Sequence, residues 1–185
     1  MNRAGYVLAG GRSSRMGRDK ALLPFRGGTL AQAVARAVAQ AAGSATLVGD
    51  PESYGRLGFS VIADLYPGEG PLGGIVTVLG HTAADWNLVT ACDMPAITVE
   101  LLAMLLDKAE RLDADALVPA GPRHLEPLCA VYHRRAHRAL AEQFAGGVRK
   151  VAAALAGIRA VRLPMMEVSC FQNVNTPEEW SACDR

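Results

Sequence analysis

The sequence predicts one α/β domain of three layers, in which helices cover both faces of a mostly parallel β-sheet. Short apolar segments of strand length alternate along the chain with longer amphipathic segments of helical length, a pattern typical of a parallel sheet. The chain has 185 residues, a length typical of a single domain, so we expect residues 1–185 to fold as one unit. Half of the residues are hydrophobic and 20% are charged, which is an ordinary globular composition.

The candidate strands are short and continuously apolar. The first covers residues 5–9 and is stopped by two glycines, Gly10 and Gly11. The later candidates have the same character and lie at residues 46–48, 60–63, 87–91, 116–118, 128–132 and 160–163. Such runs indicate strands that are buried on both faces.

Helices are expected between most of these strands. Thr29 and Gln32 form a capping box and Gly43 is a suitable C-terminal stop, so one helix is expected between them. Its apolar face would carry Leu30, Val34, Ala37, Val38 and Ala41. Further helices are expected around residues 72–83, 98–111, 134–145 and 148–156, and a last one begins at Thr176, which is followed by Pro177 and Glu179.

Polar and glycine residues follow several of the predicted strands. Ligands of such sheets bind outside the carboxyl ends of the strands. Gly10 and Gly11 follow the first strand, Asp64 follows the third and Asp93 follows the fourth. A glycine turn, a basic loop and two carboxylates are therefore expected along one edge of the sheet.

The basic loop after the first strand is suited to phosphate. Residues 12–26 contain five basic residues and one acid. Two glycines let backbone N–H groups approach an anion, and Arg15 and Lys20 can add charge-assisted hydrogen bonds to phosphate oxygens. The spacing is not that of the P-loop. The alternative is a surface loop whose basic side chains face water.

The two carboxylates have a catalytic and a structural interpretation. Asp93 at the end of an apolar strand suits Mg²⁺, which prefers one or two carboxylates together with water and substrate phosphates. Alternatively, Asp93 caps the following turn. Asp64 has the same two interpretations, because the Leu-Tyr-Pro-Gly segment behind it is itself a turn sequence.

Two weaker patterns are interpreted structurally. Residues 68–73 match Gly-x-Gly-x-x-Gly, but prolines interrupt the segment and no strand ends directly before it, so a glycine-rich turn into the next helix is expected. His133 and His137 have a spacing that zinc ligands can have. Three arginines surround them and no zincin glutamate lies between them, which favours a solvated basic face.

Charge and hydropathy disfavour several classes of partner. The net charge is +1 and only 5% of residues are aromatic, so we expect no nucleic-acid partner. No apolar stretch approaches the ~20 residues that span a bilayer, so we expect no membrane segment. The four cysteines form no Cys-x-x-Cys pair, and with no export signal evident the expected compartment is the cytoplasm.

Four segments together resemble one family. They are the loop from Leu8 to Lys20, the segment from Asp64 to Gly74, Cys92-Asp93-Met-Pro, and the Phe-Gln-Asn-Val-Asn-Thr-Pro-Glu-Glu segment that begins at Phe171. In this order they resemble the molybdenum cofactor guanylyltransferases, or MobA proteins, over residues 5–180. The resemblance implies a Rossmann-like nucleotidyltransferase fold. It also implies Mg²⁺-dependent transfer of GMP from GTP to molybdenum-bound molybdopterin, giving molybdopterin guanine dinucleotide and pyrophosphate.

The resemblance also implies roles for individual residues. Lys20, Arg15 and Asp93 would be catalytic, and Asp93 and Asn175 would hold the metal. Asn173 and Asn175 would lie on the molybdopterin side. The nucleotide would contact Leu8, Ala9, Gly10, Gly11, Lys20, Asp64 and Asp93. Some members carry an asparagine after the second strand where this chain has Gly49.

Related activities remain open from the sequence. A CTP-dependent molybdopterin cytidylyltransferase and another small nucleotidyltransferase are the alternatives, and a nucleotide-binding regulator without transfer activity is a third. The Leu8-Ala9-Gly10-Gly11 form of the first loop favours the guanylyl branch, because cytidylyl relatives tend to Leu-Ala-Ala-Gly. The resemblance further implies transient contacts with cofactor-delivering proteins and with acceptor molybdoenzymes.

Overall fold

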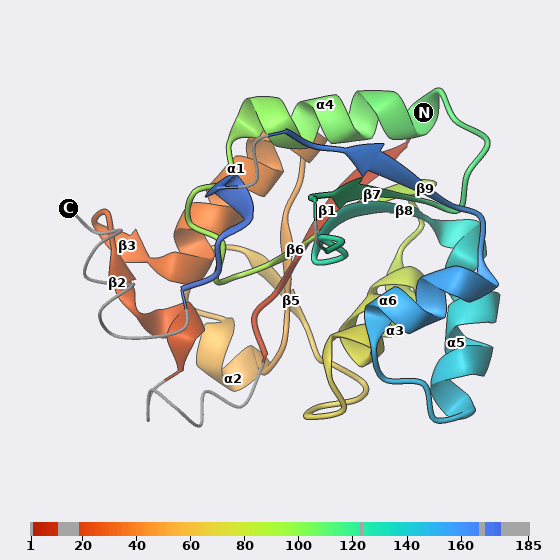
Figure 1. Cartoon of the computed structure of the whole chain (residues 1–185). Helices are drawn as coiled ribbons and strands as arrows, with labels where there is room; N and C mark the ends of the chain where they lie inside the picture. The colour runs from red at the N-terminus through yellow and green to blue at the C-terminus, as the bar shows by residue number, and fades with distance from the viewer. Residues whose placement is uncertain (1, 11–18, 123, 167–168, 175–185) are drawn as a thin grey trace.

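A seven-stranded sheet organises the molecule (Figure 1). The structure is a computed structural model that describes residues 2–10, 19–122, 124–166 and 169–174. The strand order is β5-β4-β1-β6-β8-β7-β9, and every strand is parallel to the others except β8, which runs antiparallel to both β6 and β7. The strands are β1 (Arg3–Leu8), β4 (Thr46–Val48), β5 (Ser60–Ile62), β6 (Trp86–Ala91), β7 (Ala116–Ala120), β8 (Cys129–His133) and β9 (Ala160–Pro164). The predicted, mostly parallel sheet is confirmed.

Helices cover both faces of this sheet, which confirms the three-layer architecture. One face packs against α1 (Leu30–Ala42) and α4 (Val99–Glu110). The other face packs against α3 (Pro71–His81), α5 (His137–Ala145) and α6 (Val151–Ala154). The smaller elements are α2 (Pro51–Tyr54), a hairpin of β2 (Pro24–Phe25) and β3 (Gly28–Thr29), and the 3₁₀ turns η1 (Lys20–Leu22), η2 (Arg134–Ala136), η3 (Leu155–Gly157) and η4 (Ser169–Phe171).

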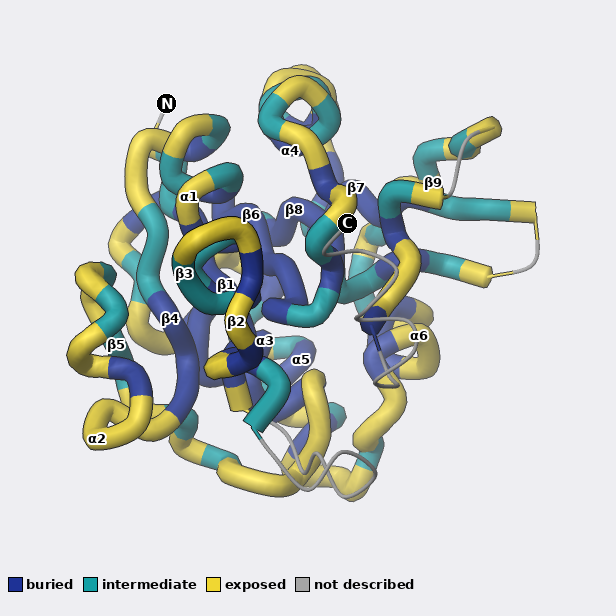
Figure 2. The backbone as a smooth tube through the Cα atoms, turned by 90° about the vertical axis from the view of Figure 1, so that its left-hand side faces the viewer, coloured by how far each residue is buried: buried dark blue, intermediate teal, exposed yellow. Residues whose placement is uncertain are grey.

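The central strands are the most deeply buried part of the fold (Figure 2). All six residues of β6 are buried, and so are the last four residues of β1. Alternate residues of β1 enter the two cores, with Val7 on the α1–α4 side and Tyr6 and Leu8 on the other side. Because these two strands cannot shift without exposing apolar surface, their carboxyl ends give rigid support to the loops attached there.

The first helix forms as its local sequence predicts. Thr29 accepts a hydrogen bond from the Gln32 N–H while the Gln32 side chain accepts one from the Thr29 N–H, and this completes the capping box. The helix ends at Gly43 with φ +80°, a conformation that favours glycine. On the predicted face, three residues are fully buried and Ala37 and Ala41 are partly buried against the same core.

Several elements differ from the predictions. The helix expected from residue 148 begins at Val151, because Lys150 has extended backbone angles and the Arg149 side chain is held by the carbonyl of Phe144. Residues 134–136 form a 3₁₀ turn before α5. The β2–β3 hairpin and α2 were not predicted, since they are too short to show periodicity. The helix expected from Thr176 lies outside the described residues.

Candidate functional site

A cavity of about 660 Å³ opens at the carboxyl ends of the parallel strands. It lies where the loops after β1, β4, β5 and β6 meet, which is the edge that the sequence predicted. Seven of the predicted site residues line it, namely Leu8, Ala9, Gly10, Lys20, Asp64, Asp93 and Asn173. The other three, Gly11, Arg15 and Asn175, lie outside the described residues.

Lys20 and Asp93 face each other within this cavity. The Lys20 ammonium nitrogen lies 3.6 Å from Oδ2 of Asp93, and each side chain is 18% exposed. Lys20 begins η1, whose first turn is capped by Asp19 through a 3.0 Å hydrogen bond from the Ala21 N–H to Oδ1. Asp93 follows the fully buried strand β6 by two residues. A cation and an anion are thus brought together from two separate loops.

The other carboxylate oxygen of Asp93 is suited to a metal ion. Oδ1 is buried, and no hydrogen-bond partner for it is found among the described residues. Burial raises the pKa of Asp93, and the positive charge of Lys20 opposes this rise. A buried oxygen without a hydrogen-bond donor carries a desolvation cost that a hard cation can offset, so this residue fits Mg²⁺.

The segment near the end of the described chain is tied to the backbone of Asp93. The Val174 N–H donates to the backbone carbonyl of Asp93 at 2.9 Å. Phe171 and Val174 are buried, whereas Asn173 between them is exposed and lines the cavity. This brings residues 171–174 to the site, although they are distant in sequence from the loops that form the rest of it.

Asp64 has a turn role and also lines the cavity. Its Oδ1 accepts hydrogen bonds from the Tyr66 N–H at 3.0 Å and from the Thr77 hydroxyl at 3.2 Å. The turn interpretation that the sequence left open is therefore correct for this oxygen. The same residue lies on the cavity wall, so the structural role does not exclude contact with a ligand.

The glycine-rich segment between Asp64 and α3 forms a turn, as expected. Gly68 and Gly70 have φ values of +81° and +91°, which only glycine adopts readily. Both residues line the cavity, and α3 begins immediately afterwards at Pro71. The Gly-x-Gly-x-x-Gly segment therefore does not directly follow a strand. It forms a turn whose glycine backbone lies along the cavity wall.

Tyr54 is a site residue that the sequence did not reveal. Its ring occupies the space beside Gly49, where an added Cβ would lie 2.5 Å from a ring carbon of Tyr54. A side chain at position 49 is therefore incompatible with this ring position. The available signal was the Asp50-Pro51 helix start directly after β4, which places α2 and Tyr54 on the cavity wall.

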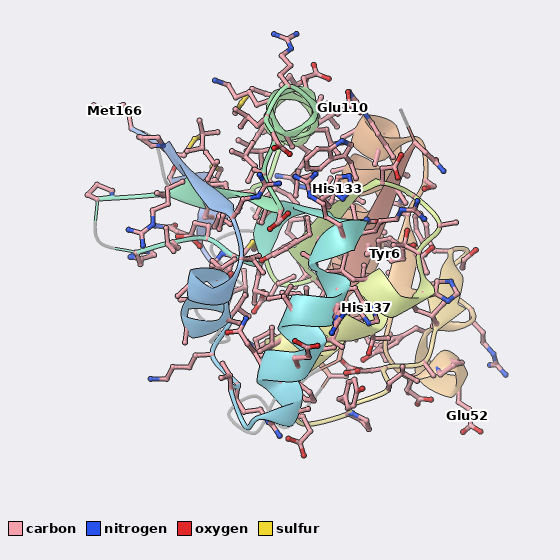
Figure 3. The ribbon with its side chains drawn as sticks, turned by 90° about the vertical axis from the view of Figure 1, so that its right-hand side faces the viewer. Tyr6, Glu52, Glu110, His133, His137 and Met166 are labelled. Carbon is pink, nitrogen blue, oxygen red and sulfur yellow. The ribbon has the colours of Figure 1, made fainter. Side chains whose placement is uncertain are left out.

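The two histidines lie away from this site. His133 pairs with Trp86, the first residue of β6, so it lies at the opposite edge of the sheet, and its ring packs against the Trp86 ring (Figure 3). Its Nδ1 accepts a hydrogen bond from the Arg135 N–H. Among the described residues, no group of three or more His, Cys, Asp or Glu side chains could hold a metal ion.

In the part of the chain that the structure describes, no helix is both long enough and apolar enough to cross a bilayer.

A family model and curated relatives match most of this chain. The sequence model of the MobA-like NTP transferase domain matches residues 5–160. A "Probable molybdenum cofactor guanylyltransferase" of Pelotomaculum thermopropionicum is 38% identical over 186 residues, covering 95% of this chain and 88% of the relative. The "Molybdenum cofactor guanylyltransferase" of Xanthomonas euvesicatoria is 35% identical over 96% of this chain and 92% of its own.

A solved structure has the same overall fold. Molybdopterin-guanine dinucleotide biosynthesis protein A from Archaeoglobus fulgidus superposes with a TM-score of 0.84 at 28% identity, covering 98% of this chain and 96% of that one. The similarity extends over nearly all of both chains.

Proposed function

Because the chain belongs to the MobA-like NTP transferase family, we propose that it transfers GMP from GTP to molybdenum-bound molybdopterin and releases pyrophosphate. The observation that carries the proposal is the pairing of Lys20 with Asp93 in the cavity, where one oxygen of Asp93 is buried without a hydrogen-bond donor among the described residues. This arrangement offers a cation for phosphate and a ligand for a divalent metal at one place.

The proposed reaction needs charge neutralisation and alignment more than covalent chemistry. A phosphate of the acceptor attacks the α-phosphate of GTP, so several negative charges must be held close together. Lys20 is placed to offset part of that charge, and a Cβ added at Gly10 would meet no atom of the described residues within 4 Å. Magnesium held by Asp93 would supply further positive charge to the phosphate oxygens.

The remaining family residues belong to the proposal as well. Arg15 would assist Lys20 at the phosphates, Gly11 would contact the nucleotide, and Asn175 would join Asp93 at the metal. Asn173 would face the molybdopterin substrate, in accord with its exposed position on the cavity wall. We place the reaction in the cytoplasm, with transient contacts to cofactor-delivering proteins and to acceptor molybdoenzymes.

Guanine is the proposed base. Guanine presents O6 as an acceptor and N1–H and N2–H₂ as donors, so a pocket built for it would leave its own polar groups unpaired with cytosine, at about 1–3 kcal/mol each. Glycine at position 10 leaves backbone groups accessible to the larger purine. Because the Tyr54 ring excludes a side chain at position 49, base recognition here would use no side chain at that position.

The decisive test is pyrophosphate release with each nucleoside triphosphate, with and without molybdenum-loaded molybdopterin. We expect release only with GTP, acceptor and Mg²⁺ together, and loss of release on chelation. Competition between equal concentrations of GTP and CTP, with separation of the dinucleotide products, then tests the base. A cytosine dinucleotide as the main product would refute the guanylyl assignment, and binding without any transfer would favour a nucleotide-binding regulator.

A further inference from the structure

We infer that Tyr54 is a positioning residue whose hydroxyl ties Ala9 to Asp19, on either side of residues 10–18, and so sets Lys20 opposite Asp93. The inference rests on the proposed function, because it assigns Tyr54 a part in nucleotide use at that site. It concerns the hydroxyl, and not only the packing of the ring.

The hydroxyl of Tyr54 lies between the two ends of the loop. It lies 2.7 Å from the carbonyl oxygen of Ala9 and 2.7 Å from Oδ2 of Asp19, and it shares its one hydrogen between these acceptors. Ala9 follows β1 directly, and Asp19 directly precedes η1. One side chain from α2 therefore bridges the residues on either side of the segment that the sequence predicts to bind phosphate.

Burial keeps this hydroxyl a donor. Tyr54 is 4% exposed, and burial together with the nearby Asp19 carboxylate raises its pKa far above the ordinary range of tyrosine. The phenol is therefore protonated near neutral pH and can donate a hydrogen bond. Removing it would leave two buried or part-buried acceptors with one donor fewer, which is costly inside a protein.

Asp19 connects the Tyr54 hydroxyl to the turn that begins at Lys20. Its Oδ2 is held by Tyr54, while its Oδ1 accepts from the Ala21 N–H at 3.0 Å and so caps η1. Ala21 is fully buried, which anchors the turn to the core. Lys20 begins this turn and reaches Asp93 from it. If Asp19 loses the Tyr54 hydroxyl, the carboxylate that caps this turn is held less firmly.

Tyr54 is itself rigidly held. The N–H of Tyr54 donates to the Asp50 carbonyl at 3.0 Å, and Asp50 caps α2 through the Glu52 N–H at 3.1 Å. Gly49 lets the ring lie directly against the backbone after β4. Because β4 pairs with β1, the helix α2 that follows β4 lies close to the end of β1. Through Tyr54, α2 thereby holds Ala9 and Asp19 in place.

A double-mutant cycle distinguishes positioning from packing. The variants are Tyr54→Phe, which keeps the ring, Lys20→Ala, and both together. We measure kcat/KM for GTP, and separately Kd for GTP in Mg²⁺ by calorimetry. If Tyr54 acts through Lys20, Tyr54→Phe lowers kcat/KM and weakens GTP binding about 10-fold when Lys20 is present, and less than 3-fold when it is absent.

A matched control removes another buried tyrosine hydroxyl. Tyr132→Phe deletes a 2.8 Å hydrogen bond to the Pro127 carbonyl, and Tyr132 does not line the cavity. We expect it to lower the melting temperature without changing GTP binding. Asp19→Ala is the second probe, and its effect should not add to that of Tyr54→Phe.

The outcomes separate the two proposals. Equal losses for Tyr54→Phe in both backgrounds, or no loss at all, would overturn the inference. If the parent protein binds GTP but transfers nothing, the proposed function fails, and the Kd cycle still decides the role of Tyr54. If the parent protein binds no GTP, both proposals fail. If Tyr54→Phe does not fold, Asp19→Asn takes its place in the cycle with the same criteria, because the amide keeps an oxygen to cap η1 and removes the carboxylate oxygen that the Tyr54 hydroxyl contacts.

Discussion

The ammonium of Lys20 lies 3.6 Å from the carboxylate of Asp93, and this pair joins the loop after β1 to the end of β6. The separation is longer than a strong hydrogen bond, so the carboxylate of Asp93 does not hold the lysine tightly. Burial disfavours the charged form of Asp93, and Lys20 offsets part of that cost. The two residues therefore depend on each other, and substitutions at either one make the clearest tests.

Replacing Lys20 by alanine should weaken nucleotide use without unfolding the protein. The side chain contributes charge to a cavity and is not part of either hydrophobic core. Loss of one charge-assisted phosphate contact costs about 2–3 kcal/mol, or roughly 30–150-fold in kcat/KM for GTP. The exposed Lys108→Ala on α4 is the matched control and should behave as the parent does. A Lys20→Ala enzyme of parental activity would refute the assignment.

Replacing Asp93 by asparagine should abolish most turnover at saturating Mg²⁺. The amide keeps the shape of the side chain but removes the charge that would hold a cation, and roughly 10²–10⁴ in rate should disappear. The melting temperature should stay within a few degrees, because the neutral amide is isosteric and no longer carries the desolvation cost of the buried carboxylate. Titration with Mn²⁺, followed by its paramagnetic signal, should show weakened binding. Near-normal turnover would instead support a capping role for Asp93.

Replacing Gly49 by alanine should disturb both stability and nucleotide use. The new Cβ would lie 2.5 Å from a Tyr54 ring carbon, so the ring must move and the backbone beside it must adjust. Such overpacking costs about 1–3 kcal/mol, which a melting curve measures. We also expect a higher KM for GTP, because the displaced ring carries the hydroxyl that contacts Ala9 and Asp19.

The control for that substitution is Gly146→Ala at the end of α5. Its added Cβ would come no closer than 3.4 Å to other atoms, and its φ of −74° suits alanine. It should melt as the parent does and keep the parental KM. An unchanged melting temperature in Gly49→Ala would show that Tyr54 is free to move aside.

The ion pair between Arg3 and Glu110 should make stability depend on pH. The Arg3 guanidinium bonds Glu110 at 2.6 Å and lowers the pKa of that carboxyl (Figure 3 labels Glu110). Because the folded pKa is below the unfolded one, the stabilisation is present above the ordinary glutamate pKa and is lost as the pH falls through the folded value. Arg3→Met should therefore lower the melting temperature at pH 7 by about 2–4 °C and by less at an acidic pH below the ordinary pKa of glutamate, as differential scanning calorimetry can measure.

An exposed ion pair provides the comparison. Arg138 bonds Glu142 one helical turn away, and the arginine side chain is 90% exposed. Solvent screens such a pair, so Arg138→Met should give no measurable shift at either pH. Equal shifts for Arg3→Met at both pH values would show that the loss is one of packing and not of charge.

Local sequence patterns were sufficient for much of the fold and part of the site. The α1 capping box, the stop at Gly43 and the strand-length apolar runs each depend on residues a few positions apart, and they form as predicted. The rule that ligands bind at the carboxyl ends of strands placed Asp64 and Asp93 at one edge, and both line the cavity. Each of these features can be recognised from residues that lie close together in the sequence.

Strand direction was not visible in the same way. The first four residues of β8 are all buried, so both faces of the strand are apolar and its sequence would look the same in either direction. Its antiparallel course follows from the loop that joins it to β7 and from the position left between β6 and β7. The order of the strands is likewise set by which apolar surfaces fit together across the whole chain.

The sequence by itself determined the class of fold, the ends of α1, and the residue types that follow each strand. Only the tertiary structure decided that Tyr54 would bridge Ala9 and Asp19, and that Lys20 would meet Asp93. Caps and apolar periodicity act through neighbouring residues and can be recognised in a short window of sequence. Contacts between separate loops depend on the packing of β4, β1 and β6 side by side, which is a property of the assembled sheet.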